Sequence, residues 1–473
     1  MRNYKLILNK VKFALLFVLL MGFVLSSCQI DKSINTDPNN IAESKVKSVD
    51  GVNALLVGLQ VNVGETYSRD RSRIFSIWTW QMCAPPGIGR AQPVAWNNYF
   101  MNVDGPTDDY WIITYRGMKI CNDIISFVPD VFVDVNAPTG NTIKAIAYTY
   151  KAFLLGEAAA TWGSIPIQIS GTEPPDFVEQ NVAYQAVQKI LDSALATINA
   201  GTASVSRDLN FAGDANKWTA VIHSLKARYY LHVGDYANAL AESKLGIADA
   251  TGSVYSFFSD TPGEHSSWGQ WVQDEGETIR PEKYYVDLFK TEPTDTRIAA
   301  YFYPNANGQF FGYAAHASKE NLYQTPIDTN ELSVANCVTM KKYSTYSESF
   351  PLIRYEENVL IQAECEAKVG SPANAVSLVN IVRTNAGLPN FSSSDPTAIV
   401  TEVLKQKFLE LYLEGQCYHD MRRTGTLVDP VAGSNLRFIY GQSERNANTK
   451  VPTDNDQLNK YILNTKYGGL ISN

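Results

Sequence analysis

The stretch from Pro351 to Gly425 limits the possible folds more than any other part of this sequence, because its apolar residues recur at helical spacing. Three successive segments share that spacing: Leu352, Tyr355, Val359, Ala363 and Ala367; Val376, Val379 and Val382; and Val400, Val403, Leu404, Phe408 and Leu411. In the first segment, the opposite face carries Glu356, Glu357, Glu364 and Lys368, as in a helix that is buried on one side. The periodicity therefore predicts three amphipathic helices.

The same stretch carries signals for where these helices begin and end. Ser371 followed by Pro372 is typical of a cap and a first turn, and Asp395 followed by Pro396 opens the third helix in the same way. Gly387 ends the second helix. Helices joined by such short loops lie antiparallel. We therefore predict a helical hairpin with a third helix stacked on it, which is a framework rather than a catalytic site.

Helical patterns also recur earlier in the chain. They cover Ile143 to Trp162, Tyr184 to Ile198, Trp218 to Val233 and Gly234 to Ala250. The last of these, a Gly-Asp-Tyr turn followed by an Ala-rich helix, resembles a tetratricopeptide repeat. The sequence thus predicts an all-α fold, in which tetratricopeptide-like helical repeats support a subdomain of irregular, aromatic-rich loops.

The irregular part consists of two turn-rich segments, Arg73 to Tyr115 and Val254 to Tyr346, which together hold six of the eight tryptophans. Long loops of this kind in a compact domain are usually functional. An exposed aromatic ring offers a flat apolar face to a sugar or a peptide side chain, although a tryptophan can equally fill a core, as we expect for Trp111 and Trp218. The predicted ligand-binding residues are Trp78, Trp80, Trp96, Trp268, Trp271 and Tyr313.

The N-terminus has the features of a secretory signal. Basic residues precede an apolar run from Phe13 to Leu25, which is short for a membrane span. The sequence that follows, Leu25-Ser-Ser-Cys28, resembles a bacterial lipobox, in which the cysteine is acylated after cleavage. We expect a signal peptide over residues 1–27, a lipid-anchored tether over 28–45 and one binding domain over 46–473.

Composition and scattered side chains exclude several functions. The net charge of −8 argues against nucleic acid as a partner. The five histidines form no cluster at metal-ligand spacing, and no phosphate-binding or nucleophile motif is present, so we expect no metal, no cofactor and no enzymatic activity. Paired carboxylates for glycoside cleavage need only be near in space and stay open at this point. Export permits a disulfide among the five cysteines after Cys28, but their spacing does not demand one. Cys365 and Cys417, which lie in helical patterns, are expected to be buried free thiols.

Two fragments of the C-terminal stretch together resemble the signature of the SusD/RagB family of nutrient-binding lipoproteins. They are PLIRY with Glu357, Ala363 and Glu364, and the later Glu410-Leu411, Glu414-Gly415 and Arg422-Arg423-Thr424-Gly425. Gln406-Lys407, where many members have Glu-Arg, and the segment Ile34 to Asn40 are similar to one branch of that family. Thr161 to Ile167 also resembles a family motif, and in the family pattern Glu364 and Arg422 belong to the helical framework.

The resemblance implies a surface lipoprotein on the outer face of the outer membrane. Such a protein captures an oligomeric nutrient and acts as the lid of a SusC-type TonB-dependent transporter, by binding and hand-over without covalent chemistry. An oligosaccharide is the first choice of ligand and an oligopeptide, as in RagB-like members, is the second. Two rivals remain open: a lipid-anchored hydrolase, and an adhesion or scaffold module, because tetratricopeptide-like helices commonly bind proteins.

Overall fold

The computed structural model describes residues 43–88, 90–169, 173–276, 278–425 and 437–452. The chain divides into two compact units, Met1–Gly51 and Val52–Asn473. In the first unit, the described residues hold α2 (Glu43–Val46) and the beginning of α3 (Val49–Ser68). The predicted signal peptide, Cys28 and most of the predicted tether lie outside the described residues.

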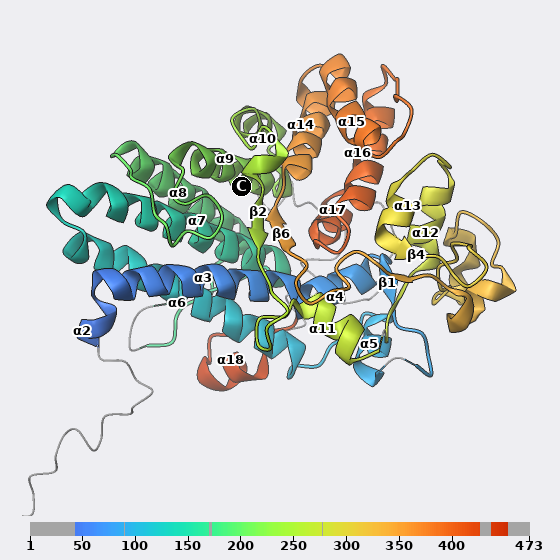
Figure 1. The fold of residues 1–473 in the computed structure, drawn as a ribbon, viewed down its shortest axis with the longest axis horizontal. Coiled ribbons are helices and arrows are strands. Elements are labelled where there is room, and N and C mark those ends of the chain that lie inside the picture. Colours follow the sequence, from blue (N-terminus) through green and yellow to red (C-terminus); the bar gives the residue numbers. More distant parts are fainter. Residues whose placement is uncertain (1–42, 89, 170–172, 277, 426–436, 453–473) are drawn as a thin grey trace, which may run out of the picture. The chain divides into compact units, whose positions relative to one another are not determined.

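The second unit is mainly helical, which confirms the predicted fold class (Figure 1). Its main helices are α6 (Pro106–Val131), α7 (Ala137–Trp162), α8 (Gln180–Asn199), α9 (Ala215–His232), α10 (Tyr236–Ser243), α14 (Tyr355–Val369), α15 (Pro372–Asn385), α16 (Pro396–Glu410) and α17 (Gln416–Thr424). Successive helices pack on one another from α6 to α10, and α10 then packs on α14. This packing of each helix on its neighbour in sequence is what a helical repeat requires.

Local features of the sequence shape these repeat helices. The Asp214 carboxylate accepts hydrogen bonds from two backbone N–H groups in the first turn of α9, and Asp235 caps α10 in the same way. Gly156 allows α9 to approach α7 closely, because a Cβ atom there would lie 2.3 Å from the ring of Tyr229. The Tyr229 hydroxyl donates a hydrogen bond to the carbonyl of Phe153 at 3.0 Å. The helices α7 and α9 are thus held in close contact.

The C-terminal helices α14, α15 and α16 pack against one another, as the sequence predicted. Their shared core comprises Val359, Leu360, Ala363, Ala367, Ala375, Val379, Val382, Ile399 and Val403. The Asp395 carboxylate accepts a hydrogen bond from the backbone N–H of Thr397 at the start of α16. Phe408 and Leu411, placed by the sequence on the buried face, are 1% and 0% exposed.

One detail of this region differs from the prediction. Leu352, placed at helical spacing, lies in β6 (Phe350–Ile353), which pairs antiparallel with β2 (Val254–Ser256). It is still buried, but in the large core of the unit and not in the core shared by α14, α15 and α16. The third helix ends where its apolar stripe ends, and Leu413 (φ 64°) and Gly415 (φ 82°) adopt left-handed backbone conformations that separate α17 from α16.

Most of the two aromatic-rich segments forms short elements, as expected for an irregular subdomain. Residues 106–115, predicted as part of the first segment, instead begin the long helix α6. The short helices of the two segments are α4 (Asp70–Trp78), α5 (Ala91–Trp96), α11 (Ser267–Asp274), α12 (Lys283–Lys290) and α13 (Arg297–Tyr301), with 3-10 turns η3 (Ala317–Leu322), η4 (Thr329–Leu332) and η5 (Val334–Asn336). The strands β1 (Met82–Cys83) and β3 (Arg280–Pro281) pair antiparallel, as do β4 (Phe302–Tyr303) and β5 (Thr339–Met340). Elsewhere in the chain lie η1 (Asp134–Asn136), η2 (Ala250–Gly252) and α18 (Gln442–Ala447).

Four charged side chains and one neutral histidine, from five helices, meet in the core of this unit. We call them the central ion network: Arg71 of α4, Glu157 of α7, Arg228 of α9, Glu357 of α14 and His419 of α17. Each is at most 4% exposed. Glu157 binds Arg71 and also Arg228, at 3.4 Å, while Arg228 binds Glu357 at 2.6 Å. Buried charges persist only when they are paired, so this network ties the repeats to the C-terminal helices.

Glu364 and Arg422, which the family pattern assigned to the framework, are both buried. Glu364 binds Arg423 at 2.6 Å, and Arg422 donates a hydrogen bond to the carbonyl of Ala160. Cys365 and Cys417 are free and buried, as predicted, and so are the other three described cysteines. In the ranges that the structure describes, no helix has both the length and the apolar character needed to span a membrane.

Candidate functional site

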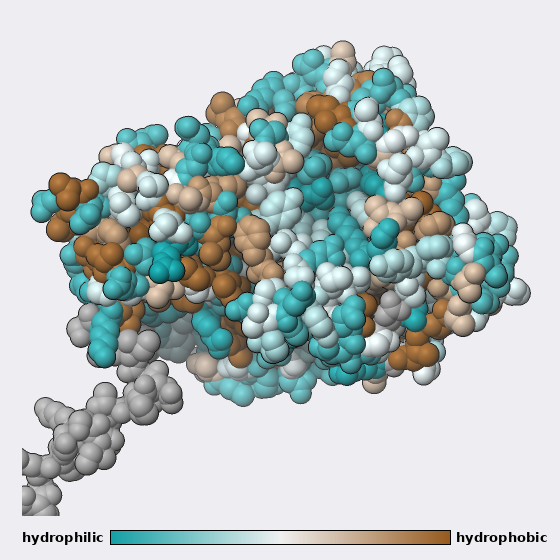
Figure 2. All heavy atoms as spheres, viewed as in Figure 1, coloured by the Kyte–Doolittle hydropathy of each residue, from teal (hydrophilic) through white to brown (hydrophobic). Residues whose placement is uncertain are grey.

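Five of the predicted ligand-binding aromatics are buried. The exposed fractions are 0% for Trp78, 1% for Trp80, 3% for Trp96, 1% for Trp268 and 6% for Trp271. The prediction that these rings face solvent is therefore wrong. On the face of the molecule in Figure 2, apolar residues of the described chain form separate patches among polar ones. The structure does not bring the predicted residues together along one open aromatic cleft.

Segments distant in the sequence account for this burial. The ring of Trp80 stacks on His316 with centroids 4.1 Å apart, and Trp271 lies under the guanidinium of Arg73 at 4.0 Å. The indole N–H of Trp268 donates a hydrogen bond to the hydroxyl of Ser72 at 3.0 Å. These contacts occupy the ring faces and the indole N–H groups that would otherwise be free to bind a ligand.

Tyr313 is the predicted residue that keeps partial exposure. Its backbone connects two elements, because its N–H donates to the carbonyl of Pro281 and its carbonyl accepts from the N–H of Lys283. Burial raises the pKa of its hydroxyl, which stays neutral. Tyr313 does not line the cavity described below, so its role in ligand contact stays a prediction.

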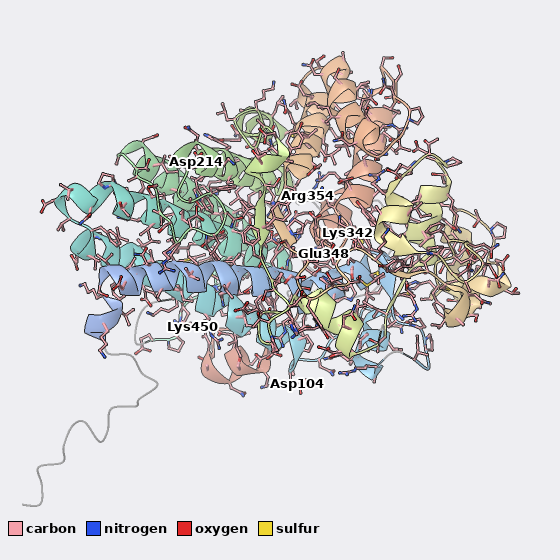
Figure 3. The ribbon with its side chains drawn as sticks, in the orientation of Figure 1. Asp104, Asp214, Lys342, Glu348, Arg354 and Lys450 are labelled. Carbon is pink, nitrogen blue, oxygen red and sulfur yellow. The ribbon has the colours of Figure 1, made fainter. Side chains whose placement is uncertain are left out.

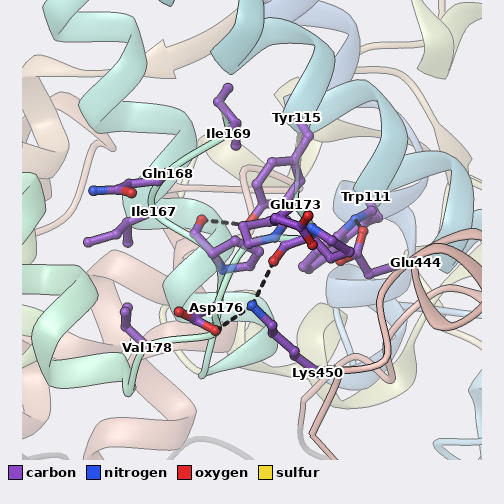
Figure 4. Close-up of a pocket in the computed structure, with 13 residues that line it drawn as sticks. Trp111, Tyr115, Ile167, Gln168, Ile169, Glu173, Asp176, Val178, Glu444 and Lys450 are labelled. Carbon is purple, nitrogen blue, oxygen red and sulfur yellow. Dashed lines mark hydrogen bonds and ion pairs between the residues drawn. The ribbon is translucent and has the colours of Figure 1, made fainter. Parts of the chain in front are cut away.

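A cavity of about 750 Å³ lies elsewhere, beside the first half of α6 (Figure 4). Three segments form its walls: α6 itself, the chain that follows α7, and α18 with the residues after it. The lining residues are Trp111, Tyr115, Pro166, Ile167, Gln168, Ile169, Glu173, Pro174, Pro175, Asp176, Val178, Glu444 and Lys450. Its size and mixed lining are typical of a small-molecule or oligomer site.

The middle wall is a loop whose ends are pinned together. Gly163 (φ 83°) ends α7 in a conformation that favours glycine, and the chain then turns back on itself. Ile165 and Val178 exchange backbone hydrogen bonds of 3.1 and 3.0 Å. The Tyr440 hydroxyl donates to the carbonyl of Ser164 at 2.7 Å, which joins this loop to the C-terminal segment.

The aromatic wall of the cavity is rigid. Trp111 is 3% exposed, and its ring lies between Tyr115, at 4.5 Å, and Phe177, at 6.1 Å and almost parallel. Because neighbouring rings cover the Trp111 ring, it supports the wall of the cavity and does not offer an exposed face on which a ligand could stack. Tyr115 is half-buried and donates its hydroxyl to the carbonyl of Pro166 at 3.0 Å. Burial, with the charge of Glu444, raises the pKa of Tyr115 well above its usual value, so the phenol stays neutral.

The polar wall centres on Glu444, which is half-buried. One carboxylate oxygen accepts a hydrogen bond from the indole N–H of Trp111 at 3.1 Å, and the other accepts from the amide of Asn448 at 3.0 Å. The same Asn448 amide donates to the carbonyl of Pro175 at 3.0 Å. Lys450 binds Asp176 at 2.8 Å and the carbonyl of Pro174 at 2.9 Å, as the dashed lines in Figure 4 mark.

This arrangement suits binding. Prolines, isoleucines and Tyr115 offer apolar surface to the C–H faces of a ligand, and carboxylates and carbonyls offer hydrogen-bond acceptors. In the described part of the chain, no group of three or more His, Cys, Asp or Glu residues is placed to hold a metal ion.

Sequence reasoning found only part of this site. It placed Trp111 in the core, which is confirmed, and it singled out the segment Thr161 to Ile167, which enters the cavity wall. It missed Tyr115 and Glu444. Tyr115 lies four residues after Trp111, on the same face of a helix, which is a signal that could have found it.

Comparisons with known proteins agree with one another. A family model described as starch-binding and associating with the outer membrane matches residues 47–375, and a SusD family model matches residues 312–467. The SusD-like protein P38 of Formosa agariphila is 22% identical over 339 residues, which are 60% of this chain and 66% of that protein, just under two thirds of its length.

Solved structures share the fold at low sequence identity. A SusD/RagB family protein of Bacteroides thetaiotaomicron has a TM-score of 0.66 at 17% identity, covering 88% of this chain and 99% of its own. A SusD homologue of Bacteroides fragilis has a TM-score of 0.67 at 14% identity, covering 86% and 96%. A chitin-binding protein has a TM-score of 0.65 at 15% identity, covering 84% and 94%.

Proposed function

Because the chain belongs to the SusD family, we propose that it binds an oligomeric nutrient at the outer face of the outer membrane and delivers it to a SusC-type TonB-dependent transporter. The ligand of first choice is a glycan. The description of the matching family as starch-binding and the chitin-binding neighbour both support this choice. In this proposal residues 46–473 are one binding domain, and the ligand leaves chemically unchanged.

The observation that carries the proposal for this chain is the cavity beside α6. A sugar ring has apolar C–H faces and an edge of hydroxyl groups. Tyr115, Ile167 and Pro174 match the first, and Glu444 with Gln168 matches the second. Because the aromatic wall is packed before any ligand arrives, little conformational entropy is lost on binding.

We expect Tyr115→Ala to weaken glycan binding by about 1–2 kcal/mol, or roughly tenfold, since aromatic contacts beyond simple burial are of that size. Calorimetric titration of the wild-type ectodomain and the variant with maltoheptaose and with chitin hexamer measures the change. Tyr303→Ala is the matched control, because Tyr303 is 51% exposed and lies outside the cavity lining.

Unchanged affinity of the Tyr115→Ala variant would place the ligand outside this cavity. Binding of an oligopeptide library in place of either oligosaccharide would favour the peptide-import alternative. Chromatography of the oligosaccharides after incubation separates binding from hydrolysis, because a binding protein returns them intact and a hydrolase does not.

The lipid anchor is a separate part of the proposal. Acyl chains on Cys28 bind a membrane by burying their methylene groups, so we expect Cys28→Ala to move the protein from the membrane fraction to the soluble or precursor fraction. Cys83→Ala is the control, since Cys83 is a buried thiol of the folded unit. Fractionation of the Cys28→Ala variant with the membrane would contradict the anchor.

A further inference from the structure

The wall of the cavity contains a carboxylate, Glu444, that forms no ion pair with a cation of the described residues. Glu444 is half-buried, and its two described partners, Trp111 and Asn448, are neutral hydrogen-bond donors. Among the described residues, no lysine, arginine or histidine forms an ion pair with it. A carboxylate has about four acceptor positions, so Glu444 can accept further hydrogen bonds from a ligand.

The remaining charges around the cavity are mostly negative. Glu173 and Asp176 are exposed carboxylates, and Lys450 is the one cation among the described lining residues. The Lys450 ammonium group already binds Asp176 at 2.8 Å and the carbonyl of Pro174 at 2.9 Å. Three carboxylates therefore face one ammonium group that is already paired. A concave wall with charges of one sign concentrates its field inside the cavity.

We propose that the cavity selects uncharged, hydroxyl-rich oligosaccharides that donate hydrogen bonds to Glu444, and rejects glycans that carry carboxylate or sulfate groups. This inference rests on the proposed function. An anionic sugar brought to the wall would place its charge beside Glu444, where Coulomb repulsion is stronger than in open water. A sugar hydroxyl at the same position donates a charge-assisted hydrogen bond, which is stronger than one between neutral groups.

The matched pair of probes is maltoheptaose and maltoheptaose whose primary hydroxyls have been oxidised to carboxylates. Both have the same length and ring geometry, so the charge is the variable. We expect the oxidised probe to bind the wild-type ectodomain about tenfold more weakly, or worse, at low ionic strength. The difference should shrink at 0.5 M salt, because salt screens the repulsion at a partly open site.

The variant Glu444→Gln keeps the size of the side chain and removes its charge. It should reduce the difference between the two probes severalfold, mainly by improving the binding of the oxidised one. Asp176→Asn serves as a second variant, since Asp176 is 83% exposed at its side chain and its loss releases Lys450 to attract anions. Glu348→Gln is the control: Glu348 is also half-buried, and Figure 3 shows it well away from Lys450. Thermal melts confirm that each variant is folded.

The possible failures are distinct. If neither neutral oligosaccharide, maltoheptaose nor chitin hexamer, binds the wild-type protein, the proposed function fails. If maltoheptaose binds and the oxidised form binds equally well or more tightly, the cavity does not select against charge and the inference is overturned. If folded Glu444→Gln and Asp176→Asn both leave the difference unchanged, the carboxylates of this wall do not determine specificity, which also overturns it.

Discussion

Replacing Glu157 by glutamine should lower the free energy of unfolding by about 3–5 kcal/mol, since removing one partner of a buried ion pair leaves the other charge uncompensated. Glu157 is 2% exposed and is the carboxylate that binds Arg71 in the central ion network. Arg71 is fully buried and would keep its charge, whereas Arg228 would keep Glu357 as a partner. Denaturant unfolding followed by circular dichroism measures the loss.

The control for this substitution is Asp123→Asn. Asp123 forms an ion pair with Lys119 on an exposed helix face, and such pairs contribute at most about 1 kcal/mol. If Glu157→Gln costs no more than Asp123→Asn, the central ion network does not stabilise the fold.

The pH dependence of stability follows from the same network. Burial alone would raise the pKa of Glu157, but Arg71, His419 and Arg228 lower it below its usual value. The Glu157 carboxylate therefore contributes fully to the free energy of unfolding above the pKa of a glutamate in the unfolded chain, which is about 4.3. This contribution is lost as the pH falls further. The stability difference between wild type and Glu157→Gln should narrow below about pH 4.

His419 has the same effect in a higher pH range, because burial lowers its pKa to about 4. In the unfolded chain the imidazole takes up a proton as the pH falls through about 6.5, whereas in the folded protein it stays neutral. The free energy of unfolding therefore decreases as the pH falls below about 6.5.

The second large effect is expected at Phe408, in α16. Phe408→Ala should cost about 3–5 kcal/mol, because it removes a buried ring and leaves a cavity. The ring is 1% exposed and meets Tyr285 edge to face, with centroids 5.1 Å apart. Thr401→Ala on the exposed face of the same helix is the control and should change stability by less than about 0.5 kcal/mol. A melting temperature equal to wild type would mean that the interface between α16 and α12 tolerates the cavity.

Sequence periodicity was sufficient for the C-terminal helices because their burial is set by local spacing. Val359, Ala363 and Ala367 recur on one helix face, and that face is the one that α15 and α16 cover. At Leu352 the same spacing failed, since its segment pairs as a strand with β2, about a hundred residues earlier in the chain, and its side chain is buried in the large core. The spacing of apolar residues within one segment does not show whether a distant segment pairs with it as a strand.

The site was harder to predict for the same reason. Whether an aromatic ring is exposed depends on which distant residues cover it, as Ser72 covers Trp268 and His316 covers Trp80. The cavity beside α6 exists only where three separate segments meet, and Glu444 belongs to the last of them. Composition marked the aromatic-rich segments, but an abundance of tryptophan predicts a dense core as readily as a binding surface.

The burial of all eight tryptophans has a spectroscopic consequence. Indole rings shielded from water emit at shorter wavelength and are poorly accessible to soluble quenchers, so the intrinsic fluorescence of this protein reports whether it is folded. Among the tryptophans, Trp111 lines the cavity, with its indole N–H hydrogen-bonded to Glu444. If the ligand binds in this cavity as proposed, a shift in emission on adding ligand to the folded protein should originate at Trp111. Replacing Trp111 should then abolish the response of the fluorescence to ligand and keep its response to unfolding.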